Sequence, residues 1–178
     1  MSELLKQHIF KNGLILGLIY CFVNLLQYAV GTEYYFNPYV SLVSTFIIPA
    51  VWSIFHTLKY RSLNHSSINF RDAFSSCAGI LFAAGFIEMV FQIALFNIID
   101  TQFAAELLDV TINTMVNIYT DLGKSDDDIS DLVSNIESSS NFSPLNMLMG
   151  FGFKGVQYTL FGLLVAAFTK NENPEFSE

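Results

Sequence analysis

The chain has 178 residues, of which 52% are apolar and 13% are charged, and its formal net charge at pH 7 is −8. The charged share is about half of the roughly 25% typical of soluble domains, and the apolar residues form long blocks, so an ordinary soluble globular domain is excluded. The acidic balance also argues against binding to nucleic acid. We therefore predict a single membrane domain comprising residues 1–178.

Four apolar segments are long enough to cross a bilayer, which takes about 20 helical residues for roughly 30 Å of hydrocarbon. In lipid each backbone amide must be satisfied within its own segment, so these spans are expected to be helices. The fold class predicted is all-α: a four-helix integral membrane bundle with an extracytoplasmic helical hairpin, residues 100–144, before the last helix. The predicted spans comprise residues 13–30, 40–58, 73–99 and 145–169.

The first two spans carry signals for close packing and for a bend. Gly13 and Gly17 have GxxxG spacing, which puts two small residues on one helix face and lets a neighbouring helix approach closely. Pro49 lies midway along the second span, where it should kink the helix and free a carbonyl one turn earlier. The first span also resembles the core of a signal peptide, but such cores have about 7–15 residues, which favours a retained helix.

The segment after the third span predicts the hairpin. No Gly or Pro occurs between Ile99 and Leu122, so we expect the third helix to continue out of the membrane until Gly123 stops it. Ser125 is the expected N-cap of a second, short amphipathic helix. We expect the hairpin to stand on the outer surface with its two apolar stripes facing each other. The stripes are Phe103, Leu107, Thr111, Met115, Ile118 and Leu122, and Ile129, Leu132, Val133 and Ile136.

The last span is rich in glycine. Gly155 and Gly162 are seven residues apart and predict a second packing face. The run from Gly150 to Gly155 matches GxGxxG, but no strand precedes it in this membrane span, so we interpret it as packing surface and not as a nucleotide site. Residues 126–137 have some calcium-loop offsets but lack the glycine of such loops. The sequence therefore predicts neither a cofactor nor a metal site.

The distribution of charge predicts the orientation of the spans. Ten of the 16 acidic residues fall on the side of the hairpin, together with Lys124, whereas most basic residues flank the spans on the other side. The positive-inside rule places that other side, with both termini, in the cytoplasm. The six basic residues concerned are Lys6, Lys11, Lys59, Arg61, Arg71 and Lys170.

In this order the features resemble a known family of bacterial membrane proteins, the domain-of-unknown-function family DUF4199 of Bacteroidetes. The shared layout is a glycine-bearing first helix, a basic inner loop, an acidic helical insert, and a glycine-rich last helix with a basic end. The resemblance covers Lys6 to Lys170, and residues 115–129 are its most suggestive stretch. It implies a bacterial inner (plasma) membrane with a periplasmic hairpin, and it supplies no functional residues.

Glu88 and Lys154 are the strongest candidates for a site within the membrane, where charged side chains are costly and usually paired or functional. They lie roughly 16 Å and 14 Å from the outer ends of their helices at 1.5 Å per residue, so both should lie near the midplane. Gln92 and Gln157 share their helix faces, and Asn24 lies on the first helix. Three interpretations stay open: a structural ion pair, a site for an ion or polar ligand, or a lysine that extends to the headgroups.

No set of catalytic side chains can be assembled from the spacing, so we expect a protein that is not an enzyme. Its predicted role is structural or in protein interaction. The expected partners are the lipid bilayer and either a membrane or periplasmic protein or a second copy of the chain. The alternative is a small transporter or channel that uses the polar cluster around Glu88 and Lys154.

The predicted topology can be tested with reporters that are active in one compartment only. A reporter fused after residue 120 should report the periplasm, and one fused to the carboxyl terminus should report the cytoplasm, because an odd number of spans separates them. Activity of both reporters in the same compartment would contradict the topology.

Overall fold

The computed structural model describes residues 1–32, 37–64, 67–139 and 142–171, and these are almost entirely helical. Within them, four helical segments are long and apolar enough to cross a membrane. The predicted all-α architecture with four candidate spans is therefore confirmed, and each helix is longer than its apolar stretch. The segments are Glu3–Val30, Tyr39–Leu63, Phe70–Ile99 and Pro144–Thr169.

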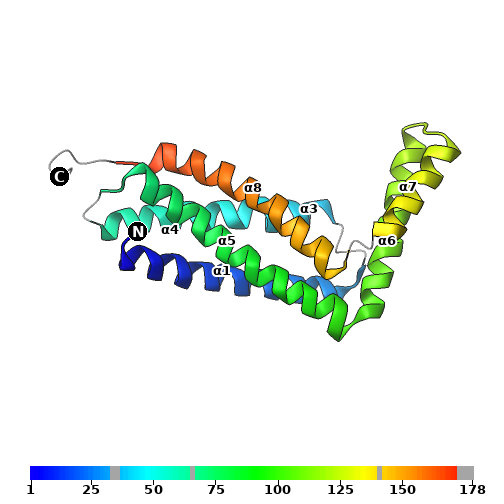
Figure 1. The fold of residues 1–178 in the computed structure, drawn as a ribbon, viewed down its shortest axis with the longest axis horizontal. Helices are drawn as coiled ribbons and strands as arrows, with labels where there is room; N and C mark the ends of the chain where they lie inside the picture. Colours follow the sequence, from blue (N-terminus) through cyan, green and yellow to red (C-terminus); the bar gives the residue numbers. More distant parts are fainter. Residues whose placement is uncertain (33–36, 65–66, 140–141, 172–178) are drawn as a thin grey trace.

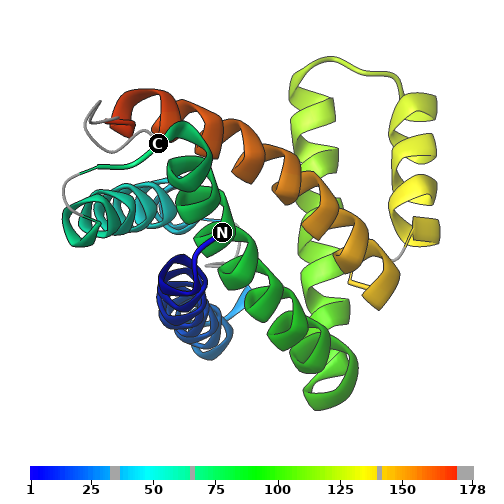
Figure 2. The same cartoon turned by 60° about the vertical axis from the view of Figure 1, so that its left-hand side comes forward.

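The helix α5 (Phe70–Ala94) lies in the middle of the bundle. It packs against α1 (Glu3–Val30), α4 (Ile48–Leu63) and α8 (Pro144–Thr169), as Figures 1 and 2 show. The buried core contains residues from α1, α5 and α8, whereas many large apolar side chains on the outer faces are exposed, as lipid-facing residues would be. The core side chains are Leu16, Tyr20, Cys77, Ile80, Leu81, Ala84 and Val165.

The glycines of the first span allow α1 to approach α5 closely. A Cβ atom added at Gly13 would lie 2.6 Å from the Cβ of Ala83, and one added at Gly17 would lie 2.8 Å from the Cβ of Ile87. Such separations are shorter than van der Waals contact, so no larger residue fits without moving the helices. The structure thus places the GxxxG face of α1 directly against α5.

The glycines of the last span differ in whether a neighbouring helix lies close to them. A Cβ atom at Gly155 would lie 2.9 Å from the ring of Phe82, and one at Gly162 would lie 2.9 Å from the Cβ of Ala78, so both face α5. An added Cβ at Gly150 or Gly152 would meet nothing within 4 Å. The interpretation of the whole GxGxxG run as packing surface is therefore wrong for these two positions, where an added side chain would meet no neighbouring helix.

The second span is interrupted by a π-helical turn just before Pro49. It consists of α3 (Pro38–Leu42), a π-helical turn η1 (Val43–Ile47) and α4, and Pro49 occupies the first turn of α4. Proline has no N–H and its ring excludes the carbonyl four residues earlier, so the wider turn relieves this conflict. The predicted irregularity is present, and it takes the form of a π-helical turn preceding the proline.

The third span ends at Asp100, contrary to the expectation of one continuous helix up to Gly123. A π-helical turn η2 (Leu95–Ile99) follows α5, Asp100 leaves the helical conformation (φ −144°, ψ 86°), and a new helix α6 (Thr101–Asp121) begins. The Asp100 carboxylate accepts hydrogen bonds from the Phe103 amide and the Tyr28 hydroxyl, both at 2.9 Å, and these lower the pKa of Asp100. Aspartate is a favourable N-cap, so it starts a helix here without Gly or Pro.

The helices α6 and α7 (Asp126–Ser139) lie side by side across the end of the bundle that is opposite the start of α1 and the end of α8, and they do not prolong its axis (Figures 1 and 2). Gly123 adopts φ +69° in the turn between them, and the Ser125 hydroxyl accepts from the Asp128 amide at 3.2 Å, as expected of an N-cap. Residues 140–141 of the predicted hairpin lie outside the described residues. The hairpin therefore runs across the bundle instead of standing up from it.

The expectation that the two hairpin stripes face each other along their length is wrong for α6. Phe103 and Leu107 are buried against Leu95 and Phe96 at the end of α5. Further along α6 the last three residues of the stripe are exposed, with exposed fractions of 38% at Met115, 44% at Ile118 and 69% at Leu122. The kink at Asp100 accounts for this, because it turns the first part of the stripe onto the bundle. The stripe of α7, Ile129, Leu132, Val133 and Ile136, is partly buried.

The packing of α1 on α5 can be tested with paired glycine substitutions. Gly17→Ala should destabilise the protein by about 1–3 kcal/mol, because the new methyl group overpacks the contact with Ile87. Gly152→Ala should be neutral or stabilise it by up to about 1 kcal/mol, because nothing lies within 4 Å and alanine favours the helix. Unfolding in detergent, followed by circular dichroism, measures both. Equal effects would contradict the close approach of α1 and α5.

Candidate functional site

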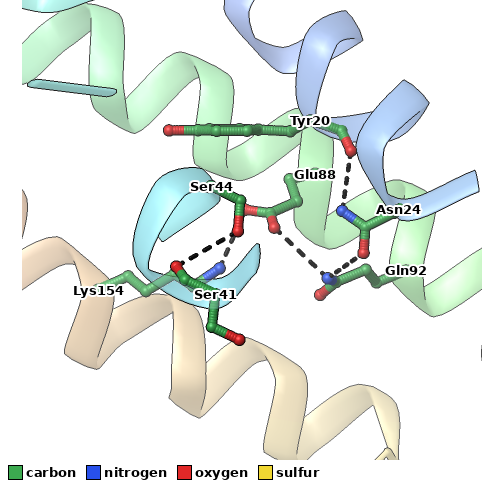
Figure 3. Close-up of polar contacts among 7 residues, drawn as sticks. All are labelled: Tyr20, Asn24, Ser41, Ser44, Glu88, Gln92 and Lys154. Carbon is green, nitrogen blue, oxygen red and sulfur yellow. Dashed lines mark hydrogen bonds and ion pairs between the residues drawn. The ribbon is translucent and has the colours of Figure 1, made fainter. Parts of the chain in front are cut away.

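An ion pair joins α5 and α8 halfway along the bundle. The Lys154 Nζ atom lies 3.0 Å from the Glu88 Oε2 atom (Figure 3). Because α5 and α8 are neighbours that run in opposite directions, residues at equal distances from the hairpin end meet. The Glu88 side chain is 13% exposed and that of Lys154 is 39% exposed, so the protein encloses the carboxylate and leaves the ammonium partly open.

Two side-chain amides extend this pair toward α1. Gln92 lies one turn after Glu88, and its Nε2 atom donates to Glu88 Oε1 at 3.4 Å and to Asn24 Oδ1 at 2.8 Å. The Nδ2 atom of the buried Asn24 in turn donates to the Tyr20 carbonyl at 2.9 Å (Figure 3). Hydrogen bonds to a charged group are stronger than neutral ones, so Gln92 and Lys154 together stabilise the Glu88 carboxylate in a place where water is scarce.

The ion pair borders a polar cavity of about 170 Å³. The cavity lies among α1, the α3–η1 segment, α5 and α8, and all five side chains predicted for the polar cluster contribute to its wall. Gln157 is an exposed part of this wall, next to Tyr158. The wall residues are Tyr20, Val23, Asn24, Gln27, Ser41, Ser44, Thr45, Glu88, Gln92, Lys154, Gln157 and Tyr158.

The second span contributes polar wall residues that the sequence reasoning missed. Ser41, Ser44 and Thr45 recur at spacings of three and four within an apolar span, and this periodicity places them on one helix face. The Ser44 hydroxyl donates to the Val40 carbonyl at 2.8 Å, which partly satisfies it within its own helix. The same periodicity applied to small hydroxyl residues, and not to charges and amides alone, would have identified this wall.

The side chains that line the cavity limit the kinds of ligand that it can bind. Its wall holds one cationic and one anionic side chain, so its formal charge is zero. Among the described residues, no group of three or more His, Cys, Asp or Glu side chains is arranged to hold a metal ion. Lys154 points to Glu88, which argues against its extension to the headgroups. The cavity is suited to binding a neutral or zwitterionic group through hydrogen bonds.

The chain matches one described protein family. Residues 11–171 match the family described as "Protein of unknown function (DUF4199)", which covers nearly the whole chain. No curated protein and no solved structure matches the chain.

The contribution of the ion pair to folding can be measured by exchanging its charges. Glu88→Lys and Lys154→Glu should each lower the folded yield, because each puts two like charges side by side in a poorly hydrated place. We expect a loss of about 1–2 kcal/mol, below the 3–5 kcal/mol of a fully buried pair, because Lys154 is partly open. The double exchange should restore the yield, measured as monodisperse protein in mild detergent. A double variant no better than either single variant would contradict direct pairing.

Proposed function

The chain belongs to the DUF4199 family of unknown function, and we propose that it is a non-enzymatic ligand-binding protein of the bacterial inner membrane. Both termini are then cytoplasmic and the hairpin is periplasmic. The positive-inside rule supports this orientation, because the start of α1, the α4–α5 connection and the end of α8 lie together at one end of the bundle and carry most of the basic residues (Figure 1).

The proposed role is to hold the polar group of a ligand in the cavity beside Glu88 and Lys154. One observation carries this proposal: the ion pair opens onto the cavity and is not sealed by packing. Each charged residue at the centre of a membrane helix costs roughly 2.5–3.5 kcal/mol to insert. An ion pair that serves only to hold two helices together is most stable when the protein also packs around its remaining polar atoms. An ammonium has three N–H donors and Glu88 takes one, which leaves donors for a ligand.

Cysteine labelling tests whether the cavity is a polar site. In a background without Cys21 and Cys77, which are free thiols, Ser44→Cys should react with N-ethylmaleimide in proteoliposomes. Val43→Cys is the matched control, because Val43 is the preceding residue, is 43% exposed and does not line the polar cavity. This uncharged reagent reaches both positions, but it reacts with the thiolate, which forms only in a polar environment. Equal labelling of the two variants would contradict the proposal.

A small transporter or channel would use the same residues, and flux separates it from a binding protein. Proteoliposomes in which Glu88→Gln abolishes an ion or solute flux, while the protein still folds, would make the cavity part of a pathway. The fold gives less support to this alternative, because transporters often pair broken helices from two halves of the chain. Of the two π-helical interruptions, only η1 borders the cavity.

A second candidate function is the binding of a membrane or periplasmic protein, or of a second copy of the chain, by the hairpin. The observation in its favour is the exposed apolar face of α6 formed by Met115, Ile118 and Leu122. Soluble surfaces seldom leave such a row of apolar side chains without a partner. The hairpin region carries nine acidic residues and one lysine, so two copies repel each other and a partner with basic residues fits better.

Photocrosslinking in cells tests the hairpin as a binding surface. A photoreactive residue at Leu122 should crosslink to another protein, whereas one at Asn113, an exposed position on the other side of α6, should not. The mass of the crosslinked product distinguishes a second copy of the chain from a different partner. Crosslinks to lipid alone would contradict this second function.

A further inference from the structure

A second, mostly apolar hollow adjoins the polar cavity. It has a volume of about 370 Å³ and shares Thr45, Gln157 and Tyr158 with the polar cavity. Its other wall residues are apolar: Phe46, Pro49, Ala50, Leu81, Leu160, Phe161 and Leu164. We call this hollow the apolar groove. The polar cavity and the apolar groove together form one amphipathic binding space, polar at one end and apolar at the other.

The packing of the bundle explains why the apolar groove opens toward lipid. The helices α4 and α8 each pack mainly on α5 and scarcely on each other, so a cleft remains between them. Leu81 of α5 is only 2% exposed, whereas Phe46 and Leu164 on the two sides of the cleft are 58% and 59% exposed. A molecule dissolved in the bilayer can therefore reach the groove between α4 and α8 without passing through water.

The charges of the polar cavity restrict the head group of such a molecule. Glu88 and Lys154 compensate each other, and a net charge on the head group would remain uncompensated in a medium of low dielectric constant. A head with both hydrogen-bond donors and acceptors matches the Glu88 carboxylate and the Lys154 ammonium. A cavity of 150 Å³ holds a benzene molecule, so one of about 170 Å³ accommodates a head of the size of a six-membered ring or a glyceryl group.

We propose that the protein binds a lipid-soluble amphipathic molecule, with its neutral hydrogen-bonding head in the polar cavity and its apolar tail in the apolar groove. The ligand enters from the bilayer between α4 and α8. This inference rests on the proposed function of the polar cavity as a binding site and names the class of ligand. An ordinary membrane lipid would also place an acyl chain in the groove, but its head would stay at the membrane surface.

Three probes that differ only in their head groups test the inference. Each has the same photoreactive dodecyl tail, and the heads are a neutral glyceryl ether, a carboxylate and a quaternary ammonium. With protein in nanodiscs of zwitterionic lipid, the glyceryl probe should crosslink at least tenfold better than the two charged probes. Mass spectrometry should locate the crosslinks on η1, α4 and α8, whose side chains line the groove.

Two variants should change the head-group preference in opposite directions. Glu88→Gln leaves the cavity with the charge of Lys154, so the carboxylate probe should become the preferred one. Lys154→Gln leaves the charge of Glu88, so the ammonium probe should be preferred. Misfolding would destroy the site and could not create a preference for one charged probe. The predicted exchange of preference therefore distinguishes a changed site from a loss of stability.

A pair of adjacent substitutions tests the apolar groove. Ala50→Trp fills the groove and should abolish crosslinking of all three probes, whereas Val51→Trp, at the next residue and outside the groove, should leave it unchanged. Equal crosslinking of the three probes in the wild-type protein, with no change in Glu88→Gln or Lys154→Gln, would overturn the inference. If Ser44→Cys is still labelled selectively in that case, the polar site stands and its ligand is not amphipathic. If the label is also absent, the proposed function fails as well.

Discussion

The organisation of this protein depends on the scarcity of water inside the bilayer. A polar group placed there must find its partner within the protein. The backbone of each span meets this requirement by forming a helix, and the polar side chains meet it by hydrogen-bonding to one another. The series from Lys154 through Glu88 and Gln92 to Asn24 satisfies this requirement across three helices. It connects the two faces of α5, and it also creates the polar cavity that we propose as a ligand site.

The small residues of the bundle determine how this polar chain is assembled. Gly17 of α1 and Gly155 of α8 let both helices come close to α5 from different sides. Gly85 of α5 leaves room for the Tyr158 side chain, because a Cβ atom there would lie 2.7 Å from the tyrosine hydroxyl oxygen. Without a hydrophobic driving force between helices in lipid, such close contacts supply much of the association energy. The same contacts bring α1 and α8 within reach of Glu88 and Gln92.

The irregular turns are as informative as the regular helices. The π-helical turn before Pro49 lies where the second span contributes Ser44 and Thr45 to the polar cavity, and π-helical turns often accompany functional sites. At the other irregular turn, Asp100 ends the third span by capping the following helix and binding Tyr28 of α1. This second turn directs the hairpin across the end of the bundle, so Phe103 and Leu107 of its apolar stripe pack there, whereas Met115, Ile118 and Leu122 stay exposed.

The sequence by itself determined the number of spans, their helical nature, the two glycine faces and the matching depths of Glu88 and Lys154 on successive helices. These follow from composition, helix periodicity and depth along a helix, which are local or one-dimensional properties. The direction of α6, the open positions of Gly150 and Gly152, and the pairing of Glu88 with Lys154 were decided by the tertiary structure alone. Each depends on which helix lies opposite a residue, and a single chain pattern carries no information about that neighbour. The groove between α4 and α8 belongs to the same group, because it exists only where two helices pack on a third and not on each other.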